Sequence, residues 1–114
     1  MNPEEQNEIT TAYTKLIEHT SLWWRSRDAN LEERRFNNTY PDSIEKSMRS
    51  MELEMELQTL LVEMISYRHS FYEVLKKYGF TSIKPFAYLN YTIMRVVDGK
   101  KQAFNLIKPD DCSL

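Results

Sequence analysis

This chain of 114 residues is poor in the residue types that build several common kinds of site. It holds two glycines, Gly79 and Gly99, one cysteine, Cys112, and two histidines. A Walker loop and a Rossmann fingerprint each need several closely spaced glycines, so neither phosphate-binding motif is possible here. One cysteine cannot form an internal disulfide, which agrees with a reducing compartment.

Long apolar runs are missing as well. No stretch of about eighteen apolar residues occurs, and no apolar signal segment opens the sequence, so membrane spanning and secretion have no support. The mean hydropathy is −0.61, yet 41% of the residues are hydrophobic, which is enough to build a core. We expect one soluble cytoplasmic domain, residues 1–108, with a flexible tail, 109–114.

Charge of one sign is not concentrated in any segment. Basic and acidic residues number 5 and 7 in 1–41, 5 and 7 in 42–79, and 5 and 3 in 80–114. A dedicated nucleic-acid-binding protein usually carries a strongly basic face. The charge pattern therefore favours protein or small-molecule partners.

Metal-ligating and catalytic residues are too scattered to define a site. His19 and His69 fall on separate predicted helices, and neither belongs to a His-x-x-x-His or Glu-x-x-His pair. The ligand spacing of a helix-borne zinc or di-iron site is therefore missing. His69 follows an apolar stripe, which is typical of a core or interface histidine. We expect no metal, no cofactor and no enzymatic activity.

The most informative stretch, residues 42–78, carries the start and stop signals of one very long helix. Asp42 is the predicted N-cap, with Glu45 as its capping-box partner. Gly79 is expected to take the left-handed conformation after the last turn, and Phe80 to close a Schellman contact. Such a helix is about 55 Å long at about 1.5 Å per residue, so other elements must lie along it.

Two apolar stripes with heptad spacing run along this helix, as in a coiled coil. The first predicts a seam for one partner helix: Leu53, Leu57, Leu60, Met64, Tyr67, Phe71, Val74 and Tyr78. The second lies on another side: Ile44, Met48, Met51, Met55, Gln58, Val62, Ile65, His69 and Tyr72. A helix that is apolar on two sides is buried from two sides. It is therefore a central helix or forms a subunit interface, and we predict self-association through Met48, Met51, Met55, Val62, Ile65 and Tyr72.

A first helix is predicted from Pro3, after the candidate N-cap Asn2, to about residue 29. Residues 28–30 can break this helix, or residues 31–36 can resume it. Its apolar stripe allows it to lie antiparallel along the second helix after a loop at residues 37–41.

The residues after Gly79 favour strands. The stretch from about 91 to 107 predicts a β-hairpin, because Asp98 and Gly99 suit a type I′ turn. The alternative is a third helix at about 85–97, which would make an all-α bundle. A lone hairpin is marginal in water, so it must pack on the helices or add strands from another subunit. The predicted fold is mainly α, a long antiparallel helical hairpin with a short C-terminal β-hairpin.

A cluster of tryptophan and arginine is the one local group that suggests binding. It consists of Trp23, Trp24, Arg25, Arg27, Arg34 and Arg35. Neighbours on a helix point about 100° apart, so one tryptophan can enter the core while the other stays at its rim. Tryptophan and arginine are enriched at protein hot spots, and they can also stack bases and hold phosphates. A core tryptophan beside a solvated basic patch is the plainer alternative.

Taken together, these patterns predict a non-enzymatic protein-binding module that forms a homo-oligomer through its long amphipathic helix. Small regulators, inhibitors and adaptors have this character. The alternative function is binding of a nucleotide or nucleic acid by the tryptophan–arginine cluster.

Overall fold

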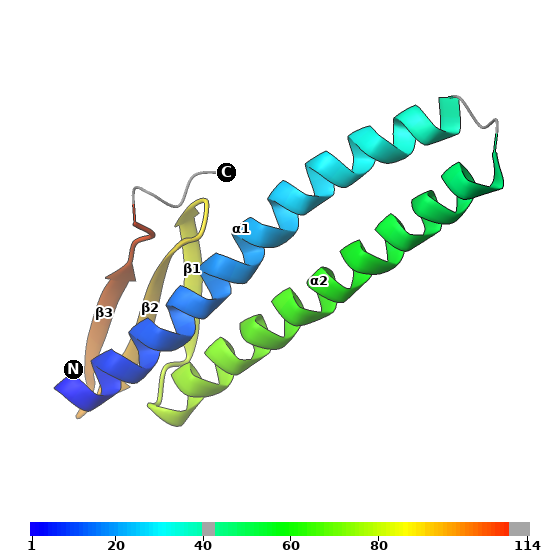
Figure 1. Cartoon of the computed structure of the whole chain (residues 1–114). Coiled ribbons are helices and arrows are strands. Elements are labelled where there is room, and N and C mark those ends of the chain that lie inside the picture. The colour runs from blue at the N-terminus through cyan, green and yellow to red at the C-terminus, as the bar shows by residue number, and fades with distance from the viewer. Residues whose placement is uncertain (40–42, 110–114) are drawn as a thin grey trace.

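The computed structural model describes residues 1–39 and 43–109, and it shows two long helices followed by a three-stranded sheet (Figure 1). The elements are α1 (Pro3–Thr39), α2 (Ile44–Lys77), β1 (Ser82–Ala87), β2 (Asn90–Val97) and β3 (Lys100–Leu106). The helices run antiparallel, and the sheet lies beside one half of the hairpin. The predicted helical hairpin with a C-terminal β element is confirmed.

The molecule is a rod. Its principal extents are 67 × 24 × 20 Å and its radius of gyration is 18.9 Å, against about 13 Å for a compact chain of this length. We call the half beside the sheet the base, residues 1–20 and 64–109. The other half, residues 21–39 and 43–63, is the tip. Only the base has three layers (Figure 1).

Helix α1 is longer than the sequence predicted. The Asn2 side chain accepts a hydrogen bond from the Glu5 amide at 2.8 Å, so the predicted N-cap is confirmed. Of the two alternatives, the end near residue 29 is wrong and the continuation through residues 31–36 is confirmed. Asn30 is buried, and its amide donates to the Leu53 carbonyl of α2. This contact holds α1 against its partner, and the helix continues to Thr39 through part of the predicted loop.

The N-cap of α2 lies one residue later than predicted. Ser43 is the N-cap, with extended backbone angles, and its hydroxyl accepts from the Lys46 amide at 3.2 Å. The prediction that Asp42 caps the helix is therefore wrong, and Asp42 itself lies outside the described residues.

The end of α2 follows the prediction closely. Gly79 has φ 82°, its amide donates to the Lys76 carbonyl at 3.1 Å, and the Phe80 amide donates to the Leu75 carbonyl at 3.0 Å. These two bonds define a Schellman motif. Glycine is needed here, because this backbone conformation is costly for residues with a Cβ atom.

The sheet is an antiparallel meander in the order β1-β2-β3. Asp98 and Gly99 both have positive φ, as a type I′ turn requires, so the predicted hairpin is confirmed and the alternative third helix is wrong. Strand β1 was not predicted, since Pro85 lies within it. Proline is tolerated there because β1 is an edge strand, where an amide hydrogen is not needed on the open side.

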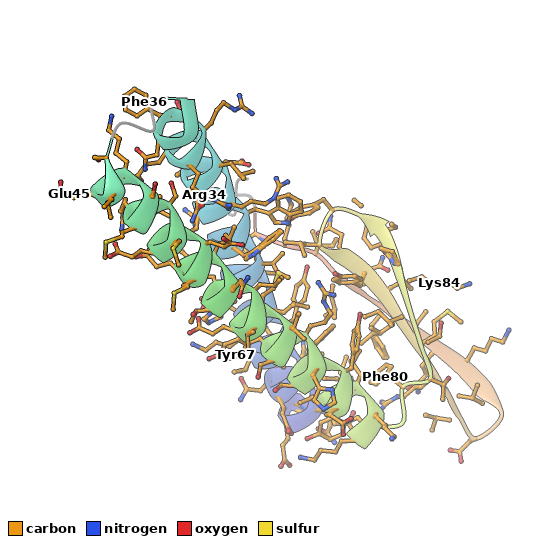
Figure 2. The ribbon with its side chains drawn as sticks, turned by 90° about the vertical axis from the view of Figure 1, so that its right-hand side faces the viewer. Arg34, Phe36, Glu45, Tyr67, Phe80 and Lys84 are labelled. Carbon is orange, nitrogen blue, oxygen red and sulfur yellow. The ribbon has the colours of Figure 1, made fainter. Side chains whose placement is uncertain are left out.

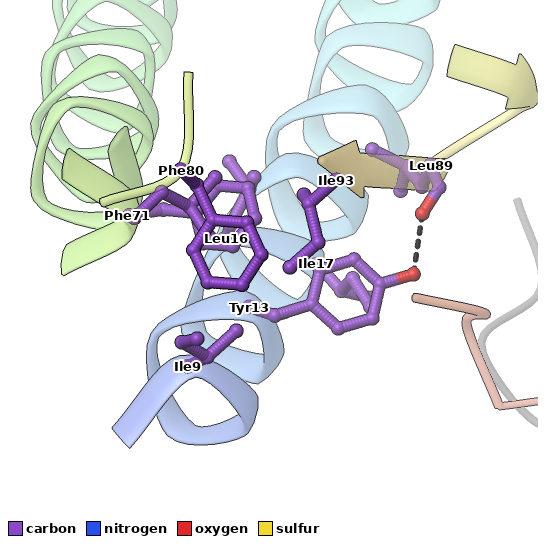
Figure 3. Packing of buried hydrophobic residues seen from close by; sticks show 9 residues of the cluster. Ile9, Tyr13, Leu16, Ile17, Phe71, Phe80, Leu89 and Ile93 are labelled. Atoms are coloured by element: carbon purple, nitrogen blue, oxygen red, sulfur yellow. Dashed lines mark hydrogen bonds between the residues drawn. The ribbon is translucent and has the colours of Figure 1, made fainter. Parts of the chain in front are cut away.

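The main core cluster lies in the base, between the helices and the sheet (Figure 3). Its buried members are Ile9, Tyr13, Leu16, Ile17, Phe71, Leu75, Phe80, Leu89 and Ile93. The Tyr13 and Phe71 rings lie 5.9 Å apart, and the Tyr13 hydroxyl donates to the Leu89 carbonyl. The first stripe of α2 is buried or half-buried along its whole length, as predicted for a seam with α1.

Arg95 on β2 fastens the sheet to the ends of both helices. Its guanidinium donates to the Tyr78 carbonyl at 2.9 Å, to the Glu5 carboxylate at 3.2 Å and to the Gln102 side chain at 3.0 Å. The same group lies 4.8 Å from the Phe80 ring, and the Arg95 side chain is only 10% exposed. One arginine thus joins α1, the end of α2, β2 and β3.

Candidate functional site

The second stripe of α2 is fully exposed. All nine positions lie at the surface, and seven of them are large apolar residues with exposed fractions from 45% to 79%: Ile44, Met48, Met51, Met55, Val62, Ile65 and Tyr72. Figure 2 shows side chains along the whole of α2, from Glu45 at the tip to Phe80 beyond its end, with the sheet only at the base. Neither α1 nor the sheet covers the stripe.

The two polar members of the stripe are also exposed. The His69 side chain is 74% exposed, and its Nε2 atom lies 3.9 Å from the Glu73 carboxylate one turn on. The possibility that His69 is a core histidine is therefore wrong for the single chain. Gln58 lies near the middle of the stripe.

A hollow of about 400 Å³ lies at the middle of the stripe. Four of the residues that line it are Met55, Gln58, Thr59 and Val62, which stand at i, i+3, i+4 and i+7. This is the spacing of the four residues that surround one inserted side chain in a coiled coil. The hollow has the arrangement that a side chain from a facing helix would fill.

The two tryptophans divide their roles as the helix geometry predicts. Trp23 is half-buried and Trp24 is 37% exposed, and their ring centroids lie 4.7 Å apart with the rings at 75°. The Arg27 guanidinium lies 6.0 Å and 5.4 Å from the two rings. Arginine over an aromatic face is a favourable cation–π arrangement.

Trp24 opens onto a groove of about 490 Å³ between α1 and the sheet. Trp24, Arg25 and Asp28 of α1 line one side, and Tyr88 and Lys108 line the other. The β1–β2 turn and the end of β3 lie beside the middle of α1 (Figure 1), which brings these distant residues together. The Lys108 ammonium lies 5.1 Å from the Tyr88 ring. Sequence reasoning missed Tyr88 and Lys108, because only the packing of the sheet places them near Trp24.

The remaining arginines of the predicted cluster do not reach this groove. Arg34 lies ten residues beyond Trp24, about 15 Å along the helix axis, and its guanidinium is 3.8 Å from the Glu54 carboxylate of α2. Arg35 follows it in the tip. The predicted six-residue patch is therefore two separate groups, and only Trp24 and Arg25 of the first group line the groove.

The turn that carries Tyr88 is held in an uncommon conformation. Leu89 has φ 58°, a region that a non-glycine residue adopts at a cost of about 1–2 kcal/mol. Its buried side chain in the core and its bond from Tyr13 hold it there (Figure 3). Burial, first of all, raises the pKa of the Tyr88 hydroxyl, and the nearby Tyr91 adds to this.

Within residues 1–39 and 43–109, no helix combines the length and the apolar character that a membrane crossing requires. The same residues contain no group of three or more histidine, cysteine, aspartate and glutamate side chains placed to hold a metal ion. No family model, no curated protein and no solved structure matches this chain.

Proposed function

We propose that this chain is a non-enzymatic protein-binding module that pairs with a second copy of itself through the second stripe of α2. The observation that carries the proposal is the uncovered heptad stripe, in which seven of nine positions are large and apolar. Contiguous apolar surface of this kind marks an interaction site on a soluble protein.

A second copy is the occupant that the spacing favours. A two-fold interface uses the same patch on both subunits, and a heptad stripe is complementary to itself. Full antiparallel overlap of two α2 helices sets Met55 opposite Ile65, and Met48 opposite Tyr72. In this alignment Val62 of the second copy lies opposite Gln58, over the hollow at the middle of the stripe.

Charge favours the antiparallel arrangement. The base holds nine basic and six acidic residues, and the tip holds six basic and eight acidic, so each tip lies along a base of opposite net charge. Glu54 then lies near Arg68 of the second copy. Glu45 near Glu73 is an unfavourable flanking pair, but exposed pairs of this kind are worth only a few tenths of a kcal/mol. A parallel pair would instead set His69 against His69.

The oligomeric state tests the proposal directly. Light scattering coupled to size exclusion should give twice the chain mass of 13.7 kDa, and high salt should not dissociate the dimer, because the interface is apolar. The double substitution Met55→Glu with Ile65→Glu should give a monomer. Leu22→Glu with Leu31→Glu, at exposed positions of α1, is the matched control and should remain a dimer. A monomeric wild type, or an unchanged mass after Met55→Glu with Ile65→Glu, would refute the proposal.

Spin labels distinguish the two orientations. With Cys112→Ser and a label at Ser47→Cys, an antiparallel dimer should place the two labels about 40 Å apart along the axis. A parallel dimer would bring them within roughly 15 Å, since packed helices lie about 8–10 Å apart. A short distance would overturn the antiparallel arrangement while leaving self-association intact.

A further inference from the structure

We propose that the groove between α1 and the sheet binds a nucleotide, whose base stacks on the rings of Trp24 and Tyr88 and whose phosphate is held by Arg25 and Lys108. This proposal does not depend on self-association, since none of the residues that line the groove belongs to the second stripe of α2.

The groove offers aromatic faces from two separate elements. Trp24 is 37% exposed and Tyr88 is 43% exposed, so both rings are accessible while still being part of a packed wall. Stacking of a base on an aromatic side chain suits every base, because each presents a π face. Trp23 supports Trp24 from the side at 4.7 Å, which limits the movement of the outer ring.

The charges at the groove suit an anion. Arg25 and Lys108 line the groove from α1 and from the end of the sheet, so an anion in the groove would lie near two positive side chains. The one carboxylate, Asp28, lies 3.8 Å from the Arg27 guanidinium, which offsets its charge. Charge-assisted hydrogen bonds from arginine and lysine to phosphate are among the strong ones.

The size of the groove favours a single nucleotide over a macromolecule. A volume of about 490 Å³ falls within the range of small-molecule sites, about 300–1,000 Å³. A stable protein interface needs roughly 800 Å² on each partner, much more than these five residues present. Arg34 lies too far along α1 to extend the groove into a track for a long nucleic acid, and its guanidinium is near Glu54.

The turn at Leu89 adds an independent observation. Backbone held in an uncommon conformation tends to occur where a site needs a side chain in a set place. Here the Tyr13 hydroxyl and the buried Leu89 side chain fix the turn, and the residue before it is Tyr88. The ring is thus presented by a rigid support.

Tryptophan fluorescence is the first test. In Trp23→Phe protein, Trp24 is the only tryptophan, and titration with AMP or ADP should quench its emission to saturation. Adenosine alone and inorganic phosphate alone should bind more weakly, since each makes half of the contacts. A single-stranded oligothymidylate, added separately, distinguishes a free nucleotide from a nucleic-acid strand as the source of the same chemistry.

Calorimetry on matched variants locates the site. Trp24→Ala should weaken AMP binding by about 5- to 150-fold, the worth of one stacked base. Lys108→Glu should weaken it by about 10-fold or more, whereas Lys100→Glu, the same charge change at the start of β3, should leave it unchanged. Both Trp24 and Tyr88 are exposed, so an unchanged melting temperature should accompany the loss after Trp24→Ala or Tyr88→Ala.

Each outcome decides the matter. Saturable AMP binding that depends on Trp24 and Lys108 supports the proposal, and binding confined to the oligothymidylate with the same dependence assigns the site to single strands. Binding that Trp24→Ala leaves unchanged, or no binding of any of these probes at millimolar concentration, would overturn it. The monomeric variant Met55→Glu with Ile65→Glu should still bind AMP, which separates this proposal from self-association.

Discussion

The base and the tip of the rod use the same two helices in different ways. In the base, α1 buries Ile9, Leu16 and Ile17 against α2 and the sheet. In the tip, the residues that α1 buries are polar, namely Ser21, Asn30 and Asn37. Apolar burial supplies most of the free energy of folding, so stability is concentrated in the base.

Polar atoms inside the tip sharpen this contrast. Among the described residues, buried side-chain atoms without a hydrogen-bond partner include the Ser21 hydroxyl, the Trp23 indole nitrogen, the Asn30 carbonyl oxygen and the Ser50 hydroxyl. Each such atom lowers the free energy of unfolding, because it has lost its hydrogen bonds to water without gaining a partner in the protein. At the same time α2 leaves its apolar second stripe uncovered along the tip. The tip, where the rod's own packing is weakest, would therefore gain most from the self-association that we propose.

The largest predicted effect on the free energy of unfolding compares two leucines of α2 that are equally buried, each 4% exposed. Leu75 belongs to the core of the base, whereas Leu53 lies in the tip beside a hollow of about 220 Å³. Leucine-to-alanine changes in cores cost about 2–5 kcal/mol, and less where the site can collapse. We expect Leu75→Ala to fall in the upper half of that range and Leu53→Ala in the lower half, measured by urea unfolding in the Met55→Glu, Ile65→Glu background. Equal losses would contradict the division into base and tip.

Removing the Arg95 guanidinium should lower the stability of the base. Arg95→Met keeps the apolar stem but leaves the Glu5 carboxylate, which is 19% exposed, without its arginine. Breaking a fully buried pair costs about 3–5 kcal/mol, so for this partly exposed pair we expect a loss of about 2–3 kcal/mol in chemical denaturation. Arg95→Lys should recover only part of it, since lysine lacks the planar fork that reaches Tyr78, Glu5 and Gln102 together. Wild-type stability in Arg95→Lys would show that the planar shape of the guanidinium is not needed.

An apolar residue in place of Asn30 should leave the stability unchanged or raise it. Asn30 is buried, and its side-chain oxygen has no partner although its amide donates to Leu53. Asn30→Leu replaces this half-satisfied group with an apolar one of similar size, which is neutral or stabilising by about 1 kcal/mol. Thermal unfolding of Asn30→Leu measures this change in stability, and Asn30→Ala, which leaves a gap, is the comparison. A loss above about 1 kcal/mol in Asn30→Leu would mean that the hydrogen bond to Leu53 outweighs the unpaired oxygen.

The smallest effect should be a pH dependence at the outer end of the base. The Tyr78 hydroxyl donates to the Glu8 carboxylate, and the Lys77 ammonium lies 3.0 Å from it; in that order of importance they hold the pKa of Glu8 below its ordinary value. A lowered pKa in the folded state gives stability that is present above the ordinary value of 4.5 and lost as the pH falls through the lowered one. Glu8→Gln should therefore be less stable than wild type near neutral pH and equal to it in strong acid. The exposed Glu4→Gln removes the same charge near the start of the same helix and serves as the control for the loss of one carboxylate.

Local signals in the sequence predicted the fold well. Asn2, Gly79 and the pair Asp98-Gly99 act through their own backbone neighbours, and each did what its residue type predicts. The end of α1 and the strand β1 could not be read in this way. Asparagine disfavours the interior of a helix, and proline disfavours a strand. Asn30 is accommodated because its side chain bonds to α2, and Pro85 is accommodated because β1 lies at the edge of the sheet.

The candidate site was predicted only in part, for the same reason. Trp24, Arg25 and Arg27 are close in sequence and in space, so a local pattern sufficed to find them. Tyr88 and Lys108 come from the far end of the chain and join the groove through the packing of the sheet. Arg34 was assigned to the group because it is near in sequence, although a helix carries it away along its axis.

The length of the rod has a consequence for how an assembled pair would present its ends. Each chain is 67 Å long and carries its sheet beside one half of the rod only (Figure 1). In the antiparallel pair that we propose, the two sheets would stand at opposite ends of a long helical spacer. The number of residues in the helices would then set the distance between the two sheets of the pair.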